Sequence, residues 1–453
     1  MSRPSYPFEV KSRDIWRIAL PASVAFITEP LAGLNDITVI GRLGDAALLG
    51  GLVLGALAFD FIFSMAYFLR TGTAGLTAQS IGSRDPQDGL IHLSRAVVAS
   101  LIIGVAMIIL SGPLLYVAGL ALAPPTPAVA DAMAAYFHVR IWSAPFSLIN
   151  YALLGWYYGR GNARTGMMLQ FIIHLVDIFL SVFFVYGLGW GIFGAALGTV
   201  LGQVVAALVG LVLVVRHFGG LRRLAPLIHP TELFDPTGLR RMIGLSRDLM
   251  LRSMALMGTY LIFAAQGSRM GEIALSANAI LLNLLMISGY FLDGMAQAAE
   301  ALCGKAVGAN YRPAYERAYA LSMRWGLGVS AGLAAFWLLG GPFVVDFMTT
   351  SEPVRAYARE FLWLAALCSL TGMPAFVYDG ILVGSTLNIT MRNGMIVALL
   401  AFLVGIFAFQ PLAGNIGLWL AIHVFYLARA AYYWQALDRR KPSLFTQPSA
   451  AGS

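Results

Sequence analysis

The 453-residue chain is far more apolar than a water-soluble protein of its length. Hydrophobic residues make up 59% of it, charged residues only 11%, and the mean hydropathy is +0.75. A soluble domain carries about 25% charged residues, which it needs to cover its surface. The net charge of +8 is spread along the whole chain, so it does not indicate a nucleic-acid-binding patch. The composition excludes a soluble protein and predicts an all-α polytopic membrane protein.

Twelve apolar runs are each long enough to cross a hydrocarbon core roughly 30 Å thick, which takes about 20 helical residues. Lipid offers no partner to unpaired backbone groups, so we expect all twelve to be helices. We expect the first to bend at Pro21 and Pro30, because each proline removes a backbone hydrogen bond. The approximate spans are 16–40, 47–69, 93–119, 134–158, 166–187, 190–215, 246–267, 273–300, 316–341, 358–385, 393–411 and 415–437.

The basic residues predict how the chain is oriented. With the N-terminus in the cytoplasm, 25 of the 30 lysines and arginines fall on inner segments and 5 on outer ones. Positive charge is enriched on the cytoplasmic side of membrane proteins, so both ends of the chain are expected there. The five expected outside are Arg42, Arg140, Arg269, Arg355 and Arg359.

The two halves of the sequence repeat. GRLGDAAL (41–48) resembles SRMGEIAL (268–275), and AQSIGSRD (78–85) resembles GKAVGANY (304–311). Duplication after an even number of helices predicts two six-helix bundles related by a pseudo-two-fold axis along the membrane normal. We expect a first half at 1–216, a cytoplasmic linker at 217–245 and a second half at 246–453. Such repeats suit a transporter that rocks between two states.

Asp36, deep in the first predicted helix, is the leading candidate for ion coupling. Charges inside a bilayer are costly and usually functional, and no lysine or arginine lies within one turn of it on that helix. A desolvated carboxyl group without a cation favours its neutral form, so Asp36 could bind and release a proton. Asn35 beside it is expected to face the substrate cavity. Glu29, two turns earlier, either passes protons or is a hydrogen-bonded structural acid. The repeat places Phe263 where Asp36 would recur, so the ion site should be one-sided.

The fifth predicted helix supplies the second candidate group. His174, Asp177 and Ser181 are spaced three and four residues apart, which places them on one helix face. Asp177 is the second coupling carboxylate. His174 titrates near neutrality or simply packs through a hydrogen bond. Thr199 and Gln203, one turn apart in the sixth helix, either complete the polar cluster or bond to backbone carbonyl groups.

The second half carries acids that we expect to act in gating or packing rather than in ion coupling. Asp293 and Glu300 lie near the inner end of the eighth helix, where Arg252 or Lys305 could pair with them and close an inner gate. Asp379 is a further buried acid with a gating or packing role.

Aromatic and amide side chains suggest a cavity for cationic or aromatic ligands. Asn150, Tyr151 and Tyr378 are the candidates, because aromatic rings attract cations. Aromatic residues near helix ends are as often anchors at the membrane interface.

Several motifs of enzymes and metalloproteins are missing from the sequence. It contains no HExxH, no GxxxxGK[ST], no GxSxG and no Cys/His cluster with metal spacing. Cys303 and Cys368 lie in apolar runs and are expected to be reduced thiols. We therefore expect no enzyme activity, no catalytic residue, no metal and no cofactor.

The combined features resemble the multidrug and toxic compound extrusion (MATE) family, and within it the DNA-damage-inducible F branch. The matching segments are LP (20–21), NDITVIGRLG (35–44), GLGWGIFGAALGT (187–199), ALSANAILLNL (274–284), YFLDGMAQAAEALCGKAVGA (290–309) and DGILVGST (379–386). The resemblance covers nearly the whole chain.

The resemblance implies export of amphipathic or cationic small molecules in exchange for H⁺ or Na⁺, across the bacterial inner membrane. It implies that Asp36 is the protonation site, that the first helix bends at Pro21, and that Thr199 is the family's sixth-helix threonine. The fifth helix departs from the family pattern, because Asp177 stands at its Asn position and Ser181 at its Asp position.

Our sequence-based expectation is an H⁺-coupled multidrug antiporter that works as a monomer and contacts only its substrates and membrane lipid. Na⁺ coupling is one alternative. A flippase for lipid-linked precursors is another, although a flippase should show a basic central cavity.

Overall fold

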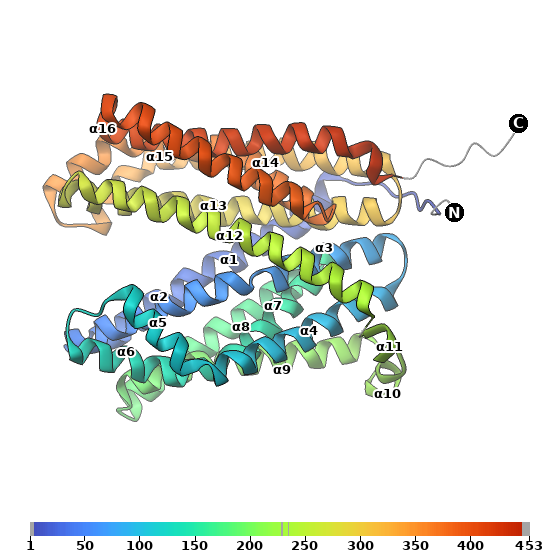
Figure 1. Cartoon of the computed structure of the whole chain (residues 1–453), viewed down its shortest axis with the longest axis horizontal. Coiled ribbons are helices and arrows are strands. Elements are labelled where there is room, and N and C mark those ends of the chain that lie inside the picture. Colours follow the sequence, from blue (N-terminus) through green and yellow to red (C-terminus); the bar gives the residue numbers. More distant parts are fainter. Residues whose placement is uncertain (1–3, 228–229, 234, 446–453) are drawn as a thin grey trace, which may run out of the picture. The chain divides into compact units, whose positions relative to one another are not determined.

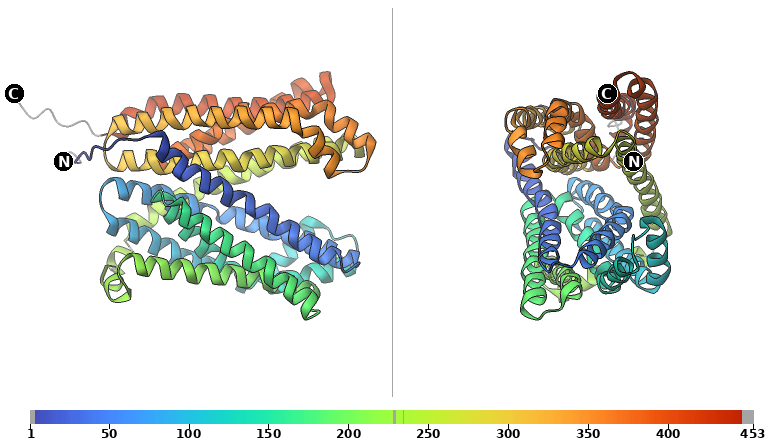
Figure 2. Two further views of the ribbon diagram at one scale, coloured as in Figure 1. Left: turned by 180° about the vertical axis from the view of Figure 1, so that it is seen from behind. Right: turned by 90° about the vertical axis from the view of Figure 1, so that its left-hand side faces the viewer.

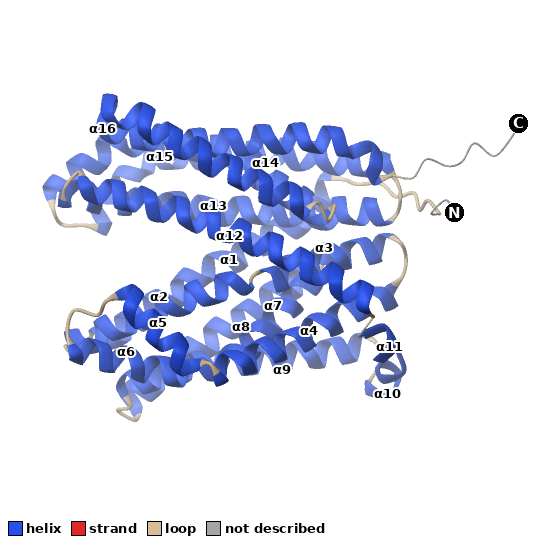
Figure 3. Ribbon diagram, in the orientation of Figure 1, coloured by secondary structure: helices blue, strands red, loops and turns tan. Residues whose placement is uncertain are grey.

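The computed structural model describes residues 4–227, 230–233 and 235–445, and within these ranges every regular element is helical (Figure 3). Ten helices in the described part are long and apolar enough to cross a membrane. The expectation of an all-α, multi-pass membrane protein is therefore confirmed.

The first half of the chain contains nine helices in the order drawn in Figure 1. They are α1 (Ser12–Gly41), α2 (Ala46–Ala66), α3 (Phe68–Gly82), α4 (Pro86–Ile109), α5 (Ser111–Leu122), α6 (Pro127–Arg140), α7 (Ala144–Gly159), α8 (Ala163–Val182) and α9 (Gly191–His217). A 3-10 turn at Ile141–Ser143 joins α6 to α7, and a π turn at Phe183–Gly187 extends α8.

Seven further helices follow α9 in the described part of the chain. They are α10 (Leu221–Leu224), α11 (Pro230–Leu233), α12 (Pro236–Arg269), α13 (Glu272–Gly308), α14 (Arg312–Met348), α15 (Glu352–Gly384) and α16 (Asn388–Arg440). Helix α12 begins ten residues before the predicted start at 246. The predicted linker at 217–245 therefore contains two short helices and the first turns of α12, while its residues 228–229 and 234 lie outside the described ranges.

Polar side chains fix where several helices start. Asp45 accepts hydrogen bonds from the backbone N–H groups of Ala47 and Leu48 at 2.8 and 3.2 Å and so caps α2. Thr126 caps α6 in the same way, and Pro127 follows it at the first helical position, where a missing N–H costs nothing.

Two predicted spans are interrupted. The span at 93–119 is divided at Leu110 into α4 and α5, because Pro113 cannot donate the backbone hydrogen bond that would continue the helix. The span at 134–158 is divided by the 3-10 turn that precedes Pro145. The predicted spans at 393–411 and 415–437 form the two stretches of α16, which meet at Gly414 with φ 53°.

The chain folds into two compact units. Unit 1 comprises the described residues up to Ser23, Ala78–Arg84 and the chain from Gly244 onward, and unit 2 comprises Val24–Thr77 and Asp85–Ile243. Helices α1 and α3 thus contribute to both units, whereas the predicted halves follow chain order alone. Whether each half forms its own six-helix domain stays a prediction.

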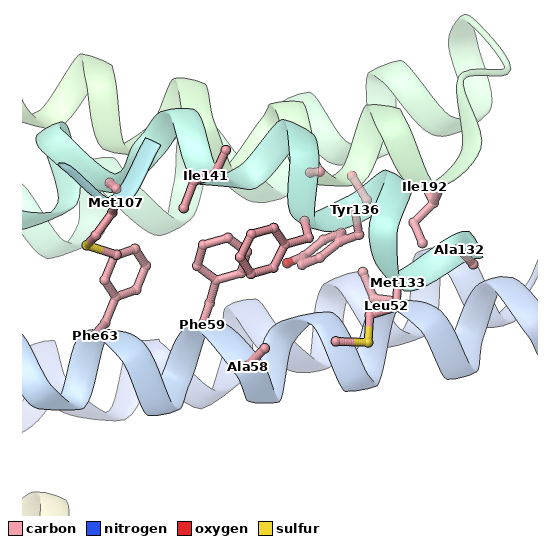
Figure 4. Close-up of a cluster of buried hydrophobic side chains, with 14 of the residues drawn as sticks. Leu52, Ala58, Phe59, Phe63, Met107, Ala132, Met133, Tyr136, Ile141 and Ile192 are labelled. Carbon is pink, nitrogen blue, oxygen red and sulfur yellow. The ribbon is translucent and has the colours of Figure 1, made fainter. Parts of the chain in front are cut away.

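Aromatic side chains fill the core of unit 2 between α2 and α6. The ring of Phe59 stacks on that of Phe137 at a centroid distance of 4.7 Å, and Phe63, Tyr136 and Ile141 extend the cluster (Figure 4). Helices α8 and α9 (both green in Figure 2) pack closely because α9 presents glycines to α8. A Cβ atom at Gly198 would lie 2.3 Å from the Ser181 Oγ.

Glycines also bring the helices of unit 1 together. A Cβ atom at Gly380 of α15 would lie 1.9 Å from the Ala296 carbonyl oxygen of α13. Gly294 of α13 lets α1 approach closely, since a Cβ atom at this position would lie 2.0 Å from the Ser23 Oγ. The Ser23 hydroxyl donates to the Phe291 carbonyl at 3.2 Å. This anchors the first part of α1 to unit 1, two residues after Pro21.

Candidate ion-coupling site

Asp36 lies on the face of α1 that packs into unit 2. Its neighbours Val39 and Ile40 are buried in the core of that unit, whereas Leu34 and Ile37 on the opposite face are exposed. Asp36 is therefore only 8% exposed. The Asn35 amide lies 3.5 Å from the Asp36 Oδ1, so this neighbour faces the carboxylate. The helical period that buries the apolar residues also buries the acid.

Asp177 is held by hydroxyl groups from two helices. The Ser181 Oγ, one turn later on α8, donates to the Asp177 Oδ1 at 3.1 Å, and the Thr199 Oγ1 from α9 donates to the same atom at 3.1 Å. Both hydroxyls also lie 3.3 Å from the Ala195 carbonyl oxygen. The close approach of α9 through Gly198 makes this arrangement possible. The structure thus brings together three predicted site residues.

The two carboxylates belong to one electrostatic group. Asp36 interacts with Asp177 across the α1–α8 boundary, and Ser181 interacts with both acids. Like charges repel each other more strongly where water is largely excluded. The pair is therefore suited to holding a proton.

Arg140 joins this group, which the sequence analysis did not foresee. It stands at the C-terminal end of α6 and interacts electrostatically with Asp36, Asp60 and Asp177. Its guanidinium donates to the Tyr136 hydroxyl and lies 5.1 Å from the centroid of the Phe59 ring. No lysine or arginine lies within one turn of Asp36 on its own helix, but tertiary packing supplies a cation from another helix.

Glu29 belongs to a second charged group in unit 2. It interacts electrostatically with Arg70 and with Asp60. Arg70 is only 6% exposed, and its guanidinium lies 4.4 Å from the Phe26 ring centroid and 5.1 Å from the Tyr158 centroid. Since Asp60 also interacts with Arg140, it links this group to that of Asp36.

The other polar candidates of unit 2 make different contacts. The buried Asn150 amide donates to the Gln203 Oε1 at 2.7 Å and to the Gln203 carbonyl oxygen at 2.9 Å, which joins α7 to α9. The Nε2 of His174 is buried without a hydrogen-bond partner in the described part of the chain. Tyr151 interacts electrostatically with Glu29 and Arg70 and packs edge-on against Tyr67. Their roles at a cavity stay predictions.

Unit 1 carries its own buried charge cluster. Both Arg252 of α12, at 2.5 Å, and Arg429 of α16 donate to the Asp379 Oδ2. Arg252 thus has an acidic partner other than Asp293 and Glu300, whose expected pairing with Arg252 or Lys305 stays a prediction. Arg429, which the sequence analysis did not single out, is 1% exposed. Tyr378, next to Asp379, shares a 2.8 Å hydrogen bond with the Tyr319 hydroxyl.

The position that repeats Asp36 is apolar. Phe263 is fully buried and packs edge-on against Trp419 at 5.1 Å between ring centroids. The Trp419 indole N–H donates to the Asn278 Oδ1 at 2.9 Å, so polar groups nearby are occupied by structural hydrogen bonds. That the ion site lies in the first half alone stays a prediction.

Comparisons with known proteins identify the family. The MatE family model matches residues 21–183 and 249–409. The chain is 34% identical to DNA damage-inducible protein F of Escherichia coli (strain K12) over 417 residues, which cover 92% of this chain and 90% of the relative.

Solved structures show the same fold. A MATE structure in the bent conformation superposes with a TM-score of 0.86 at 20% identity, covering 96% of this chain and 99% of that one. An outward-facing multidrug resistance MATE family transporter of the MOP superfamily gives a TM-score of 0.84 at 20% identity, with 96% and 97% covered. The chain therefore belongs to the MATE family, a family of membrane transporters rather than enzymes.

Proposed function

We propose that this transporter is a secondary antiporter that exports amphipathic or cationic small molecules in exchange for H⁺. The observation that carries the proposal is the interacting pair Asp36 and Asp177, which is buried in membrane-spanning helices. The Ser181 and Thr199 hydroxyls donate hydrogen bonds to the Asp177 carboxylate. Intramembrane acids in such groups typically form proton relays.

Arg140 favours H⁺ over Na⁺ as the coupling ion. A fixed guanidinium that interacts with both carboxylates weakens their attraction for any other cation. It opposes Na⁺, which is held by electrostatic attraction, more than H⁺, which forms a covalent bond to a carboxylate oxygen. The oxygens of Asp177, Ser181 and Thr199 are of the kind that hard cations prefer, so Na⁺ coupling is the alternative that an experiment must separate.

The proposed topology has twelve spans. It counts α2 with α3, α4 with α5, and α6 with α7 as one crossing each, and the two stretches of α16 as two. Two observations place the first and last described residues at the same end of unit 1: the Ser5 hydroxyl donates to the Asn310 carbonyl, and Phe445 packs on Tyr315 at 5.5 Å. The positive-inside bias puts this end in the cytoplasm of a bacterial cell, with the transporter as a monomer in the inner membrane.

The proposed cycle alternates the charge of Asp36. When Asp36 is ionised, the acids of unit 2 favour a cationic substrate. Proton binding removes that charge, changes the packing of the later part of α1 and lowers substrate affinity. Alternating access then follows from rocking of the two halves.

The nature of the buried charges supports cationic or neutral cargo. Unit 2 holds four acids and the two arginines that interact with them; the acids are Asp36, Asp60, Asp177 and Glu29, and the arginines are Arg70 and Arg140. The paired arginines of unit 1, Arg252 and Arg429, are partly neutralised by Asp379. A flippase for a pyrophosphate-linked lipid needs basic groups available to its substrate, so we regard that function as the less favoured one.

Transport by the purified protein in proteoliposomes tests the proposal. A cationic dye such as ethidium should be exported when a pH gradient alone is imposed, and not when a Na⁺ gradient alone is imposed at equal pH. Asp36→Asn should abolish the pH-driven flux. Dye export that needs Na⁺, or full activity of Asp36→Asn, would overturn it.

A further inference from the structure

Basic side chains gather at the end of unit 2 where α7 and α9 terminate. Arg160 directly follows α7, and its guanidinium donates to the Nε2 of His217, the last residue of α9, at 2.7 Å. The same guanidinium lies 4.4 Å from the Trp156 ring centroid. Arg223 folds back toward this turn, since a Cβ atom at Gly219 would lie 3.1 Å from its Nη1. Two distant segments of the chain thus form one basic cluster.

The packing of α8 against α9 adds two further arginines to this end. A Cβ atom at Gly210, in the last turns of α9, would lie 3.3 Å from Leu169, in the first turns of α8, so the two helices run antiparallel. The exposed Arg164 at the start of α8 therefore lies at the same end as the exposed Arg216 of α9.

The segments that form the cluster hold no acid to balance it. Residues 155–165 and 214–227 contain five arginines and no aspartate or glutamate. Helix α4, which packs on α7, begins with two acids that have other contacts. Asp85 accepts a hydrogen bond from the backbone N–H of Asp88, and Asp88 pairs with His92 at 3.3 Å. The cluster therefore carries positive charge that suits an anionic ligand.

An exposed apolar stripe of α9 leads into the cluster. Val205, Leu208 and Val212 are exposed and spaced three and four residues apart, which places them on one helix face. Arg216 continues this spacing by four residues. Helix α9 is long and apolar enough to cross a membrane and ends at His217. The stripe is therefore suited to contact an acyl chain, with the cluster at the level of the lipid headgroups.

We propose that Arg160, Arg216 and His217 bind the phosphate of an anionic phospholipid, whose acyl chain lies along the apolar stripe. Guanidinium groups bind phosphate oxygens through paired, charge-assisted hydrogen bonds. Because a guanidinium only donates, His217 accepts through Nε2 and carries its proton on Nδ1, which supplies a further donor for a phosphate oxygen. The buried Trp156 ring holds the Arg160 guanidinium in place. This site is separate from the proposed antiport and does not depend on the coupling ion.

Native mass spectrometry of the whole purified protein, stripped of lipid in detergent, measures the Kd of added phosphatidylglycerol. The wild type should bind phosphatidylglycerol more tightly than the zwitterionic phosphatidylcholine. Arg160→Gln/Arg216→Gln should raise the Kd of phosphatidylglycerol by about tenfold or more, since each basic group near a membrane surface contributes about fivefold. Equal Kd values for the two lipids in the wild type would overturn the proposal.

Arg312→Gln/Arg317→Gln is the matched control. It removes the same charge from α14 in unit 1, where Arg312 already pairs with Glu316 at 2.9 Å. Its Kd for phosphatidylglycerol should equal that of the wild type. A Kd raised equally in both double variants would show a general charge effect and reject a site at the end of α9.

Two further measurements separate a lipid site from its alternatives. Glycerol 3-phosphate carries a headgroup phosphate without acyl chains, and wild-type binding as tight as that of phosphatidylglycerol would assign a soluble phosphate ligand instead. If Arg160→Gln/Arg216→Gln does not fold, Arg216→Gln/Arg223→Gln replaces it, because both of its side chains are exposed. An unchanged Kd in that folded variant would likewise reject the site.

Discussion

Gly82, at the end of α3, packs directly against the backbone of Lys305 in α13. A Cβ atom at Gly82 would lie 2.0 Å from the Lys305 carbonyl oxygen, and one at Gly308 would lie 1.9 Å from the Gln79 carbonyl oxygen. These two contacts are equivalent in the repeat, because 308 − 82 and 305 − 79 both equal 226. The segments found to resemble each other in sequence, 78–85 and 304–311, therefore pack against each other within unit 1.

Gly82→Ala is expected to destabilise the protein by about 1–3 kcal/mol, because backbone must shift to admit the methyl group. Thermal unfolding in detergent measures this change. Gly72→Ala on the same helix is the control, since a Cβ atom there meets nothing within 4 Å. Equal stability of the two variants would contradict the close packing.

Asp36→Asn should lose pH-driven export and keep its fold. Arg140 still interacts with Asp60 and Asp177, so the substitution does not leave the guanidinium without an acidic partner. The stability change should therefore stay well below the about 3–5 kcal/mol that breaking a buried ion pair costs. Thermal unfolding and proteoliposome flux are measured on the same preparation. A variant that unfolds early would show that Asp36 has a structural role instead.

Asp379→Asn should destabilise unit 1 by about 3–5 kcal/mol, because it leaves the buried Arg429 without its carboxylate. Asp346→Asn is the matched control: Asp346 also pairs with two arginines, Arg355 and Arg359, but on a more exposed surface. Exposed pairs contribute about 0–1 kcal/mol. Chemical or thermal unfolding that ranks the two variants in the opposite order would disprove a structural role for the Asp379 cluster.

Thr199→Val removes a donor to the Asp177 carboxylate while keeping the shape of the side chain. We expect the free energy of unfolding to fall by about 1–3 kcal/mol, since the lost hydrogen bond involves a charged acceptor. Thr38→Val is the comparison, because its hydroxyl only bonds the Leu34 carbonyl within the same helix at 2.7 Å. The export rate of Thr199→Val should fall below that of Thr38→Val when equal amounts of the two proteins are compared. Equal rates would leave Thr199 with a packing role.

Much of the fold could be predicted from the sequence because a membrane imposes local rules. Hydrophobic runs must be helices, and helical spacing alone placed Asp177 and Ser181 on one face, where a hydrogen bond now joins them. Element boundaries were less predictable. Helices α12 and α13 run beyond the apolar segments, and the turns before Pro113 and Pro145 interrupt runs that hydropathy shows as continuous.

The membrane class, the internal repeat and the acids of the first half follow from the sequence, because each depends on composition or on residues a few positions apart. Which charges meet depends on the tertiary structure. Arg140 comes 104 residues after Asp36, and Arg429 comes 50 residues after its partner Asp379. Such neighbours are set by how helices pack, and glycines such as Gly198 and Gly294 let those helices approach until side chains from distant segments share one site.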